Sequence, residues 1–316
     1  MLIFQPELQD RLPLFLQAWW LDLLAPDRWT YFTDAAEDEA TVLWPVVLQK
    51  KWGIRIGTMA CNTQFLGPYP IRHEINDAEL ALGTAKIHQK HISGKMVTVK
   101  QSMQLQPGQL NALKKLGWQF RERVTYKINT SVLSESDMWE GLKSTRCRRV
   151  RAAEKVLLCV EGGFDKHVET IFNQTYSHRK LQVPFPARLI YTIYEKASSR
   201  GRGFILQARR QENGPTLAFG LFVHDAQHLY YLIGGADRSE DPKGLAGSLV
   251  LWNALKRAQL MGIDFDFEGS MVPGIAAFFK SFGAKPHTYY NGLWDRWPIL
   301  RKMIIPDKNR MQGKIL

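Results

Sequence analysis

The chain has 316 residues, of which 42 are Lys or Arg and 30 are Asp or Glu, so its formal net charge is +12. Hydrophobic residues make up 45% of the sequence and charged residues 23%, which excludes a disordered, collagen-like or coiled-coil protein. The positive charge either indicates an anionic partner, such as a nucleic acid, a phosphorylated cofactor or an anionic lipid surface, or serves solubility alone.

The cysteines and the N-terminal segment suggest where the protein is found. Cys61, Cys147 and Cys159 are odd in number and lack CxxC spacing, which argues against a disulfide framework or zinc site and favours a reducing compartment. The longest apolar stretch, residues 12–24, is shorter than the roughly 20 residues that span a bilayer, and it predicts an amphipathic helix. The N-terminus shows no secretory signal. We therefore expect a cytoplasmic protein without stable membrane insertion.

The first half of the chain predicts a strand hairpin, a helix, a strand, a short helix and a strand. Two apolar runs in residues 42–59 flank a turn at Lys50 to Gly53, which is typical of a β-hairpin. Asn76 and Asp77 are candidate caps of a helix that runs to about His91. The remaining elements are a strand at 96–103, a helix that Pro107 begins and Gly117 ends, and a strand at 118–129.

The second half repeats this order. Alternating apolar segments separated by turns predict antiparallel strands at 204–210, 217–223 and 228–233. The elements that follow are a helix at 243–261, a strand at 263–268, a short helix that Pro273 begins and Gly283 ends, and a strand that starts near Pro286.

The two short helices share a sequence frame. Pro107-Gly108 and Pro273-Gly274 are as far apart along the chain as Gly117 and Gly283 are. In the same register Lys114 aligns with Lys280, and the preceding strands overlay with Val99 on Phe265. The frame indicates internal duplication, although Pro at the start of a helix and Gly after its end are also common punctuation.

A strongly basic segment, residues 141–157, connects the two halves and is helical by propensity. Spacings of three or four residues place its cations on two neighbouring helix faces. We expect four of them to form a positive surface that binds an anionic substrate: Arg146, Arg148, Arg149 and Arg151. The alternative is a solvated connector.

The order of elements, the segment LKSTRCRRVRAAEK and the block FDFEGSMVPGIAAFFKSFGAKPHTYY at 265–290 resemble the Fem family of peptidoglycan aminoacyltransferases and the wider FemAB-like group of GNAT proteins. The resemblance implies an α/β (α+β) fold of two tandem GNAT-like domains. They are expected at residues 1–140 and 141–316, with the basic linking helix 141–157 in the second. It further implies an acyl- or aminoacyltransferase that acts on an amine acceptor.

The segment before the long helix of the second half bears on the acyl donor. GNAT enzymes that use acyl-CoA carry R/Q-x-x-G-x-G/A here, and backbone N–H groups hold the pyrophosphate. The sequence DRSEDPKGLAGSL offers Lys243, Gly244 and Gly247 for substrate binding, but Glu240 and Asp241 would repel a pyrophosphate. An aminoacyl-tRNA, the donor that the Fem resemblance implies, fits the basic chain better, and acyl-CoA remains the alternative. No further cofactor is expected.

Three acids in the strand at 263–268, namely Asp264, Asp266 and Glu268, alternate with apolar residues and would share one face. Crowded carboxylates raise one another's pKa, which suits a general base, although solvation or pairing with arginine would also explain them. Glu268 and Asp266 are the candidate catalytic carboxylates. Ser270 is either an oxyanion donor or a helix cap. The scattered histidines show no metal-ligand or triad spacing, so we expect no metal.

Phe279-Lys280 matches the Phe-Lys that precedes Phe-Gly in the Fem family. The resemblance implies that Lys280 is catalytic and stabilises the oxyanion, with Phe279 beside it in substrate binding. Lys114 would be its counterpart in a half without catalysis. Two other functions stay open: a GNAT-like protein that has lost catalysis and binds an anionic partner, and an acyl-CoA-dependent N-acyltransferase.

Overall fold

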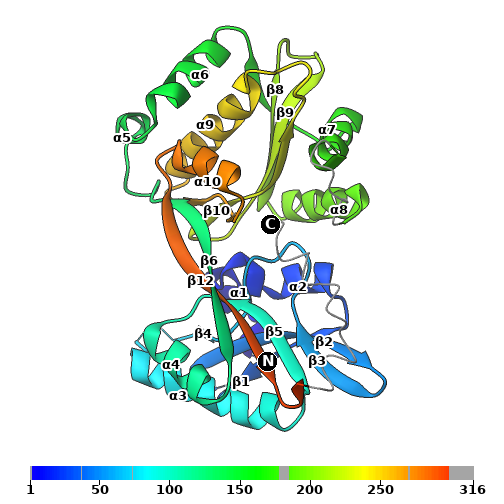
Figure 1. The fold of residues 1–316 in the computed structure, drawn as a ribbon, viewed down its shortest axis with the longest axis vertical. Helices are drawn as coiled ribbons and strands as arrows, with labels where there is room; N and C mark the ends of the chain where they lie inside the picture. The colour runs from blue at the N-terminus through cyan, green and yellow to red at the C-terminus, as the bar shows by residue number, and fades with distance from the viewer. Residues whose placement is uncertain (1, 37, 73, 178–184, 270, 299–316) are drawn as a thin grey trace. The chain divides into compact units, whose positions relative to one another are not determined.

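A computed structural model describes residues 2–36, 38–72, 74–177, 185–269 and 271–298 of the chain (Figure 1). The chain folds into two compact units, each assembled from separate parts of the sequence. Unit 1 comprises Met1–Thr125, Ser270–Val272 and His287–Leu316. Unit 2 comprises Tyr126–Gly269 and Pro273–Pro286.

The strands of unit 1 follow the order β1-β2-β3-β5-β12-β6, with β4 paired to β2. Their bounds are β1 (Trp29–Thr33), β2 (Val42–Lys51), β3 (Ile54–Thr58), β4 (Tyr69–Pro70), β5 (Thr98–Met103), β6 (Gln119–Ile128) and β12 (Lys285–Asp295). The pairs β1–β2, β2–β3, β2–β4 and β5–β12 are antiparallel, whereas β3 and β5 run parallel. The helices of this unit are α1 (Pro6–Arg11), α2 (Ala18–Leu24), α3 (Asp77–Ile87) and α4 (Pro107–Lys115), with short helical turns at Leu2–Phe4, Leu14–Leu16 and His88–Ser93.

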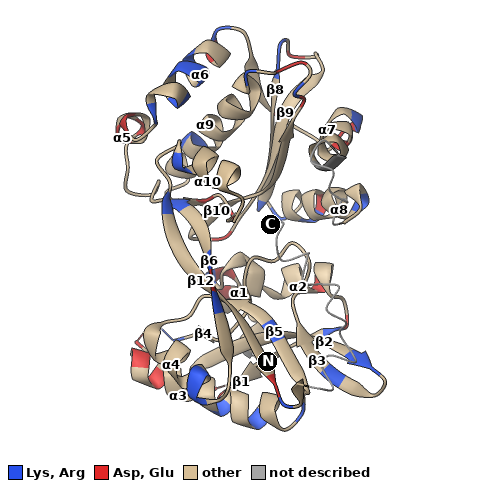
Figure 2. Ribbon diagram, in the orientation of Figure 1, with Lys and Arg blue, Asp and Glu red and all other residues tan. Residues whose placement is uncertain are grey.

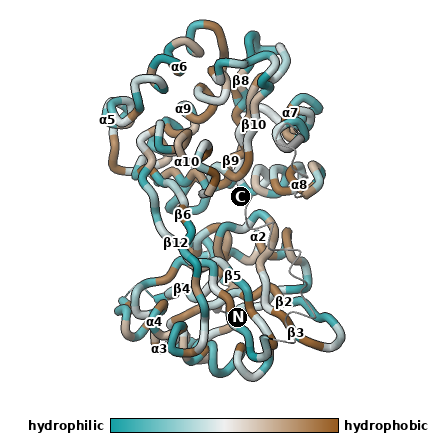
Figure 3. The backbone as a smooth tube through the Cα atoms, viewed as in Figure 1, coloured by the Kyte–Doolittle hydropathy of each residue, from teal (hydrophilic) through white to brown (hydrophobic). Residues whose placement is uncertain are grey.

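Unit 2 has the strand order β6-β11-β10-β9-β8-β7. The strands new to this unit are β7 (Leu158–Gly162), β8 (Gly203–Arg209), β9 (Thr216–His224), β10 (His228–Ala236) and β11 (Asp264–Asp266). The helices are α5 (Glu135–Glu140), α6 (Ser144–Glu154), α7 (Lys166–Ser177), α8 (Ala187–Ser198), α9 (Leu245–Leu260) and α10 (Pro273–Lys280). Helix α9 packs on β8 and β9 from one side, and α7 and α8 pack on the other (Figure 1). Figure 3 shows the hydrophobic character of the strands between these layers.

Local sequence explains where the elements begin and turn. Trp52 and Gly53 both have positive φ, 50° and 78°, and they form the two-residue turn between β2 and β3. This turn matches the twist of the strands it joins. The Asn76 side chain accepts from the Glu79 N–H and the Glu79 carboxylate accepts from the Asn76 N–H, a reciprocal cap that starts α3. The predicted hairpin and helix are therefore confirmed.

The order of elements occurs twice. The series β8-β9-β10-α9-β11-α10 repeats β1-β2-β3-α3-β5-α4, and Pro107 and Pro273 begin equivalent helices. The pairing pattern repeats too, since β3 with β5 and β10 with β11 are both parallel. The two halves therefore share their strand pairing as well as the Pro-Gly spacing of the sequence.

The two halves exchange their last strands. The strand after α4 is β6, yet the neighbour of β5 in unit 1 is β12, which follows α10. Reciprocally, β11 in unit 2 pairs with β6, through Phe265 with Ile128 and Asp266 with Lys127. The registers of both exchanged pairs match: Val99 opposite Trp294 corresponds to Phe265 opposite Ile128, and Lys100 opposite Leu293 to Asp266 opposite Lys127.

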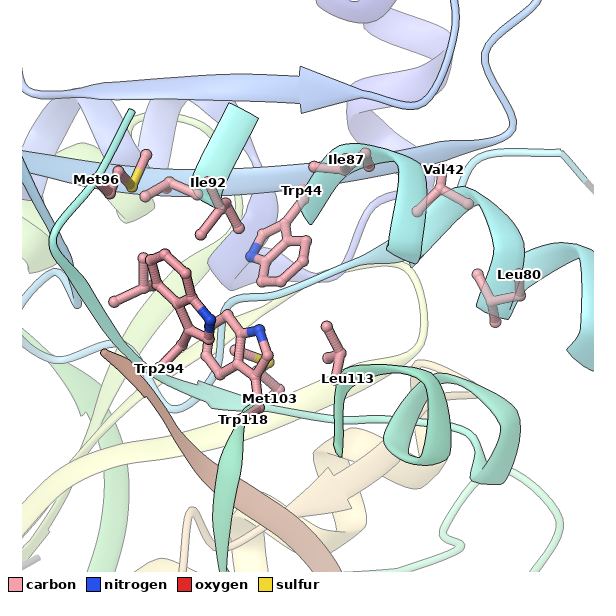
Figure 4. Packing of buried hydrophobic residues seen from close by; sticks show 12 residues of the cluster. Val42, Trp44, Leu80, Ile87, Ile92, Met96, Met103, Leu113, Trp118 and Trp294 are labelled. Atoms are coloured by element: carbon pink, nitrogen blue, oxygen red, sulfur yellow. The ribbon is translucent and has the colours of Figure 1, made fainter. Parts of the chain in front are cut away.

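The exchanged strand β12 contributes Trp294 to the core of unit 1 (Figure 4). This core packs three buried tryptophans, Trp44, Trp118 and Trp294, with aliphatic residues of α3 and β5. Two indole N–H groups find acceptors there: Trp44 donates to Gln101 Oε1 at 2.7 Å and Trp118 donates to His88 Nδ1 at 3.2 Å. Buried indoles need such partners, so the core fixes side-chain positions as well as burying area.

The structure differs from the sequence expectations in two places. Residues 12–24 do not form one helix: Pro13 interrupts the segment, which splits into the turn Leu14–Leu16 and α2. The strand expected at 263–268 ends at Asp266, because Glu268 has a φ of 63° that a strand cannot continue. Seven of the helices and strands named above were not expected from the sequence, namely β1, β4, β7, α1, α5, α7 and α8, although the pattern of α8 is strongly amphipathic.

Within the described part of the chain, no helix combines the length and the apolar character that crossing a membrane requires.

Because β12 belongs to unit 1, a substitution near the C-terminus should destabilise a unit that is built mainly from the N-terminal part of the chain. Trp294→Ala should cost about 3–5 kcal/mol of unfolding free energy, as for other buried aromatic truncations. Hydrogen exchange should increase in β5 and leave β11 unchanged, because Trp294 lies in the core with β5. Trp297→Ala, which removes a side chain 51% exposed, is the control. Faster hydrogen exchange in β11 instead of β5 would contradict the proposed exchange of strands between the two halves.

Candidate active site

The parallel pair β10–β11 in unit 2 ends abruptly. It extends only from His228 opposite Asp264 to Tyr230 opposite Asp266, and β10 then continues to Ala236 through a register shift between Tyr231 and Ile233. Irregularities of this kind occur where a sheet turns side chains toward a site. The residues after Asp266 therefore leave the sheet beside a strand that is still running.

Asp266 lies at the centre of the buried charges. Its side chain is fully buried, and its Oδ2 lies 3.4 Å from Lys127 Nζ. The two residues face each other across the β6–β11 pair, so the ion pair joins the exchanged strand to β11. A buried carboxylate without such a partner would be strongly unfavourable.

Lys127 connects the carboxylate to a histidine. Its Nζ lies 3.1 Å from His228 Nε2, and His228 Nδ1 lies 3.9 Å from Asp225 Oδ1. Burial, and then the neighbouring Lys127 cation, lower the pKa of His228. A neutral imidazole that accepts from the ammonium at Nε2 carries its proton on Nδ1, the atom nearer to Asp225.

Asp225 closes the network on the other side. It is buried and accepts from the Tyr230 hydroxyl at 2.9 Å and from the backbone N–H groups of Gln227 and His228. Burial first, and the Asp225 charge second, raise the pKa of Tyr230 well above its usual value. Tyr230 therefore stays a neutral hydrogen-bond donor.

Glu268 is a carboxyl group with neither a hydrogen bond at its Oε1 nor an ion pair among the described residues. Its backbone N–H donates to Asp266 Oδ1 at 2.8 Å, which helps to hold the left-handed backbone in place. The residue is partly buried, yet its Oε1 is out of reach of solvent and has no hydrogen-bond partner among the described residues. Burial and then the Asp266 charge raise the pKa of Glu268 well above its ordinary 4.5. Contrary to expectation, it does not continue the strand face of Asp264 and Asp266.

Phe279 and Lys280 are neighbouring residues at the end of α10. Phe279 is buried, and its ring lies 4.8 Å from that of Phe267, the residue before Glu268. Lys280 is exposed, with its Nζ 5.7 Å from the centre of the Tyr126 ring. Between described residues, no ion pair links Lys280 to Asp266 or Glu268.

The basic helix α6 divides between core and surface. Arg146 does not belong to the expected positive surface, because it is buried: it donates to Ser281 Oγ and Ser248 Oγ and stacks on Phe278 and Phe282. Burial lowers its pKa to about 10, so it remains charged at neutral pH. Arg146 thus fastens α6 to α9 and to the end of α10.

Arg148 and Arg149 are exposed, and with Lys243 they line a pocket of about 350 Å³ at the start of α9. Figure 2 shows the basic character of α6. Gly244 adopts a left-handed conformation, and a Cβ there would lie 3.8 Å from the Arg149 guanidinium. Arg151 lies apart from the pocket lining, over the ring of Trp139.

Asp241 occupies the place where a helix start would bind an anion. Its carboxylate accepts from the Leu245 N–H at 2.9 Å and the Ala246 N–H at 2.7 Å. Glu240 turns away and pairs with Arg210. Two of the backbone N–H groups at the start of α9 that could hold a pyrophosphate are therefore satisfied by the protein's own side chain.

Two of the remaining predicted residues add little to the geometry. Gly247 lies in the first turn of α9 with open space around its Cα, and Ser270 lies outside the described residues. Four residues of the network were not predicted from the sequence: Lys127, Asp225, His228 and Tyr230. His228 could have been noticed because it begins a predicted strand. Lys127 could not, because no sequence feature near it shows that it lies opposite Asp266, and that pairing depends on the strand exchange.

Comparison with known proteins gives matches at the level of structure. No family model matches the sequence, and no curated protein matches it. FemX matches with a TM-score of 0.69 at 11% identity, over 94% of this chain and 96% of FemX. The C-terminal domain of a putative lysylphosphatidylglycerol synthetase from Agrobacterium fabrum matches with a TM-score of 0.59 at 10% identity, over 99% and 98% of the two chains.

A tandem GNAT protein from the clavulanic acid biosynthesis pathway also matches, with a TM-score of 0.51 at 11% identity, over 89% of this chain and 94% of that one. These likenesses establish the fold. The chain has the tandem GNAT-like α/β fold of FemX, as the sequence resemblance implied.

The raised pKa of Glu268 makes stability depend on pH. The folded protein holds the Glu268 proton more tightly than the unfolded chain does. The protonated carboxyl therefore adds to the unfolding free energy below about pH 4.5, and this addition is lost as pH rises through the raised pKa of the folded state. From about pH 4.5 upward, the unfolding free energy of Glu268→Gln should therefore fall less than that of the unmodified protein. Urea denaturation at several pH values measures this difference. Glu122→Gln, an exposed change on β6, is the control. Identical profiles for Glu268→Gln and the unmodified protein would contradict the buried carboxyl.

Proposed function

We propose that the protein transfers an acyl or aminoacyl group onto an amine, and that Glu268 in unit 2 accepts the proton of the attacking amine. The fold is that of acyl- and aminoacyltransferases, which supports the reaction class. The observation that carries the proposal is the buried carboxyl oxygen of Glu268 without a hydrogen-bond partner in the described chain, placed where β11 ends beside the continuing β10. Such a group is costly unless a ligand completes its bonding.

The chemistry assigned to Glu268 follows from its environment. A proton acceptor is most effective when its pKa lies near the working pH, and burial beside Asp266 moves the pKa of Glu268 upward in that direction. The amine nitrogen forms a bond to the donor carbonyl carbon and gives its proton to Glu268. The bond between that carbon and the leaving oxygen or sulfur then breaks, and Glu268 returns the proton to the leaving group.

Lys280 is proposed to stabilise the oxyanion of the tetrahedral intermediate. The ring contact between Phe267 and Phe279 brings the chain next to Glu268 and the chain next to Lys280 together. The Lys280 ammonium lies over Tyr126 and forms no ion pair with a carboxylate of the described chain, so its N–H donors remain available for an anion. A cation directed at developing negative charge is the usual device for this step.

The pocket at the start of α9 is proposed to hold the anionic part of the donor. Arg148, Arg149 and Lys243 supply side-chain cations there, whereas Asp241 already satisfies the backbone N–H groups. This arrangement favours a donor with phosphates along an extended backbone, for which aminoacyl-tRNA is the candidate, over the pyrophosphate of acyl-CoA. The neighbour named as a lysylphosphatidylglycerol synthetase supports aminoacyl transfer as the reaction.

The catalytic roles predict separate losses of activity. Glu268→Gln should reduce single-turnover transfer by about 10²–10⁴-fold and Lys280→Ala by about 10²–10³-fold, the ranges for losing a positioned base and an oxyanion donor. The assay follows the labelled amino acid from charged tRNA to a panel of amines. Lys114→Ala, the matched change in unit 1, should retain full activity, and all three variants should remain folded at the pH of the assay. Equal loss in Lys114→Ala would contradict the assignment.

The donor pocket predicts a change in salt dependence. Arg148→Ala with Arg149→Ala should reduce the slope of log affinity against log salt for charged tRNA by about one unit for each phosphate that is no longer neutralised. Lys166→Ala with Lys196→Ala removes the same charge from exposed positions on α7 and α8 and should leave the slope unchanged. A melting-temperature shift with acyl-CoA but not with charged tRNA would favour a CoA-dependent enzyme instead.

A further inference from the structure

Unit 1 carries a surface of cations and exposed tryptophans that shares no residue with the site in unit 2. We call it the hairpin-tip surface; its members are Lys51, Trp52, Arg55, Lys95, Arg296 and Trp297. They come from the β2–β3 hairpin, the segment before β5 and the segment after β12, and the neighbouring strands β3, β5 and β12 bring these segments together. Figure 2 shows the basic tip of this hairpin.

Trp52 is held at the apex of the hairpin with its ring in solvent. Its left-handed backbone and that of Gly53 form the tight turn, and the side chain is 72% exposed. Lys51 Nζ lies 4.9 Å from the centre of its ring. Removing so large an apolar ring from water would be favourable, so the exposed ring is available to a partner that buries it. Trp297, 51% exposed with the Arg296 guanidinium 4.9 Å from its ring, repeats the arrangement.

A pocket of about 300 Å³ lies beside the turn, lined by Gly53 and by four members of the hairpin-tip surface: Arg55, Lys95, Arg296 and Trp297. Arg55, Lys95 and Arg296 line it, and its lining contains no carboxylate from the described chain. Gly53 and Gly94 leave open space where side chains would stand. The described residues offer these three cations no ion pair. Backbone bonds from the Val97 N–H to the Arg55 carbonyl and from the Arg296 N–H to the Val97 carbonyl hold the walls together.

We propose that the hairpin-tip surface docks unit 1 onto an anionic phospholipid bilayer. A lipid phosphate enters the pocket between the three cations, and Trp52 and Trp297 lie at the level of the headgroups. Indole rings favour that boundary because one part of the ring is apolar and its N–H is polar. Clustered Lys and Arg residues are attracted to anionic lipid, and guanidinium groups bind phosphate oxygens in pairs.

The geometry favours a lipid surface over a nucleic acid. Sites for single strands line a groove with rings on which successive bases stack. Here Trp52 lies in the tight turn between β2 and β3, with its ring exposed, and not along a groove. The β2–β3 hairpin extends from the rest of the sheet (Figure 1). One face of each tryptophan is also taken by the protein's own cation.

Co-sedimentation with vesicles tests the proposal independently of any transferase activity. The full chain should bind vesicles of phosphatidylcholine mixed with phosphatidylglycerol much more tightly than vesicles of phosphatidylcholine alone. Arg55→Gln, Lys95→Gln and Arg296→Gln together should weaken binding to the mixed vesicles by roughly fivefold per cation. The matched control, Lys114→Gln with Lys115→Gln and Arg121→Gln, removes three exposed cations elsewhere on unit 1 and should have little effect.

Trp52→Ala separates the aromatic contribution from the charge. It should weaken binding several-fold even at high salt, where the attraction between the cations and the lipid is screened. Equal binding to both vesicle types, or equal losses in the triple variant and its control, would overturn the proposal. It would also fail if the triple variant lost affinity for single-stranded RNA while its vesicle binding stayed unchanged.

Discussion

The ion pair between Lys127 and Asp266 is the constraint on which the candidate site depends. Asp266 is fully buried on β11, and its cation comes from β6, the strand that unit 2 receives from the first half of the chain. Removing one partner of such a pair typically costs about 3–5 kcal/mol, because a buried charge is left uncompensated. The strand exchange and the buried carboxylate therefore require each other: β6 supplies the charge, and the charge favours β6 in this register.

The same pair sets the protonation of its neighbours in opposite directions. The negative charge of Asp266 adds to burial in raising the pKa of Glu268, whereas the positive charge of Lys127 adds to burial in lowering the pKa of His228. One interaction thus helps to raise the pKa of a carboxyl group and to lower the pKa of an imidazole in the same unit. Perturbed groups of this kind gather where a protein handles protons, which is the physical basis for placing the chemistry in unit 2.

Much of the fold could be predicted from the sequence, because local signals determine it. Pro107 and Pro273 at helix starts, Gly53 in a tight turn and the alternating strands of the second half all follow from backbone and periodicity rules. The strand exchange could not be predicted, since β6 and β12 have the same pattern in either partner. Lys127 was missed for that reason, and Arg146 was placed on a surface because helix periodicity cannot show that Ser248 and Ser281 cover it.

The repeated register shows why chemistry is expected in one half alone. Where unit 2 has Asp266 opposite Lys127, unit 1 has Lys100 opposite Leu293. In the same register Ser102 stands in place of Glu268, and its hydroxyl donates to Asn291 Oδ1 at 2.8 Å, which leaves no unsatisfied carboxyl at that position. Ile56 and Thr58 take the positions of His228 and Tyr230 on the neighbouring strand.

Lys114 keeps the charge of Lys280 but has no counterpart of Glu268 to act with. Unit 1 therefore retains the frame of the site without its proton acceptor, and its own exposed cations and tryptophans lie at the β2–β3 hairpin instead.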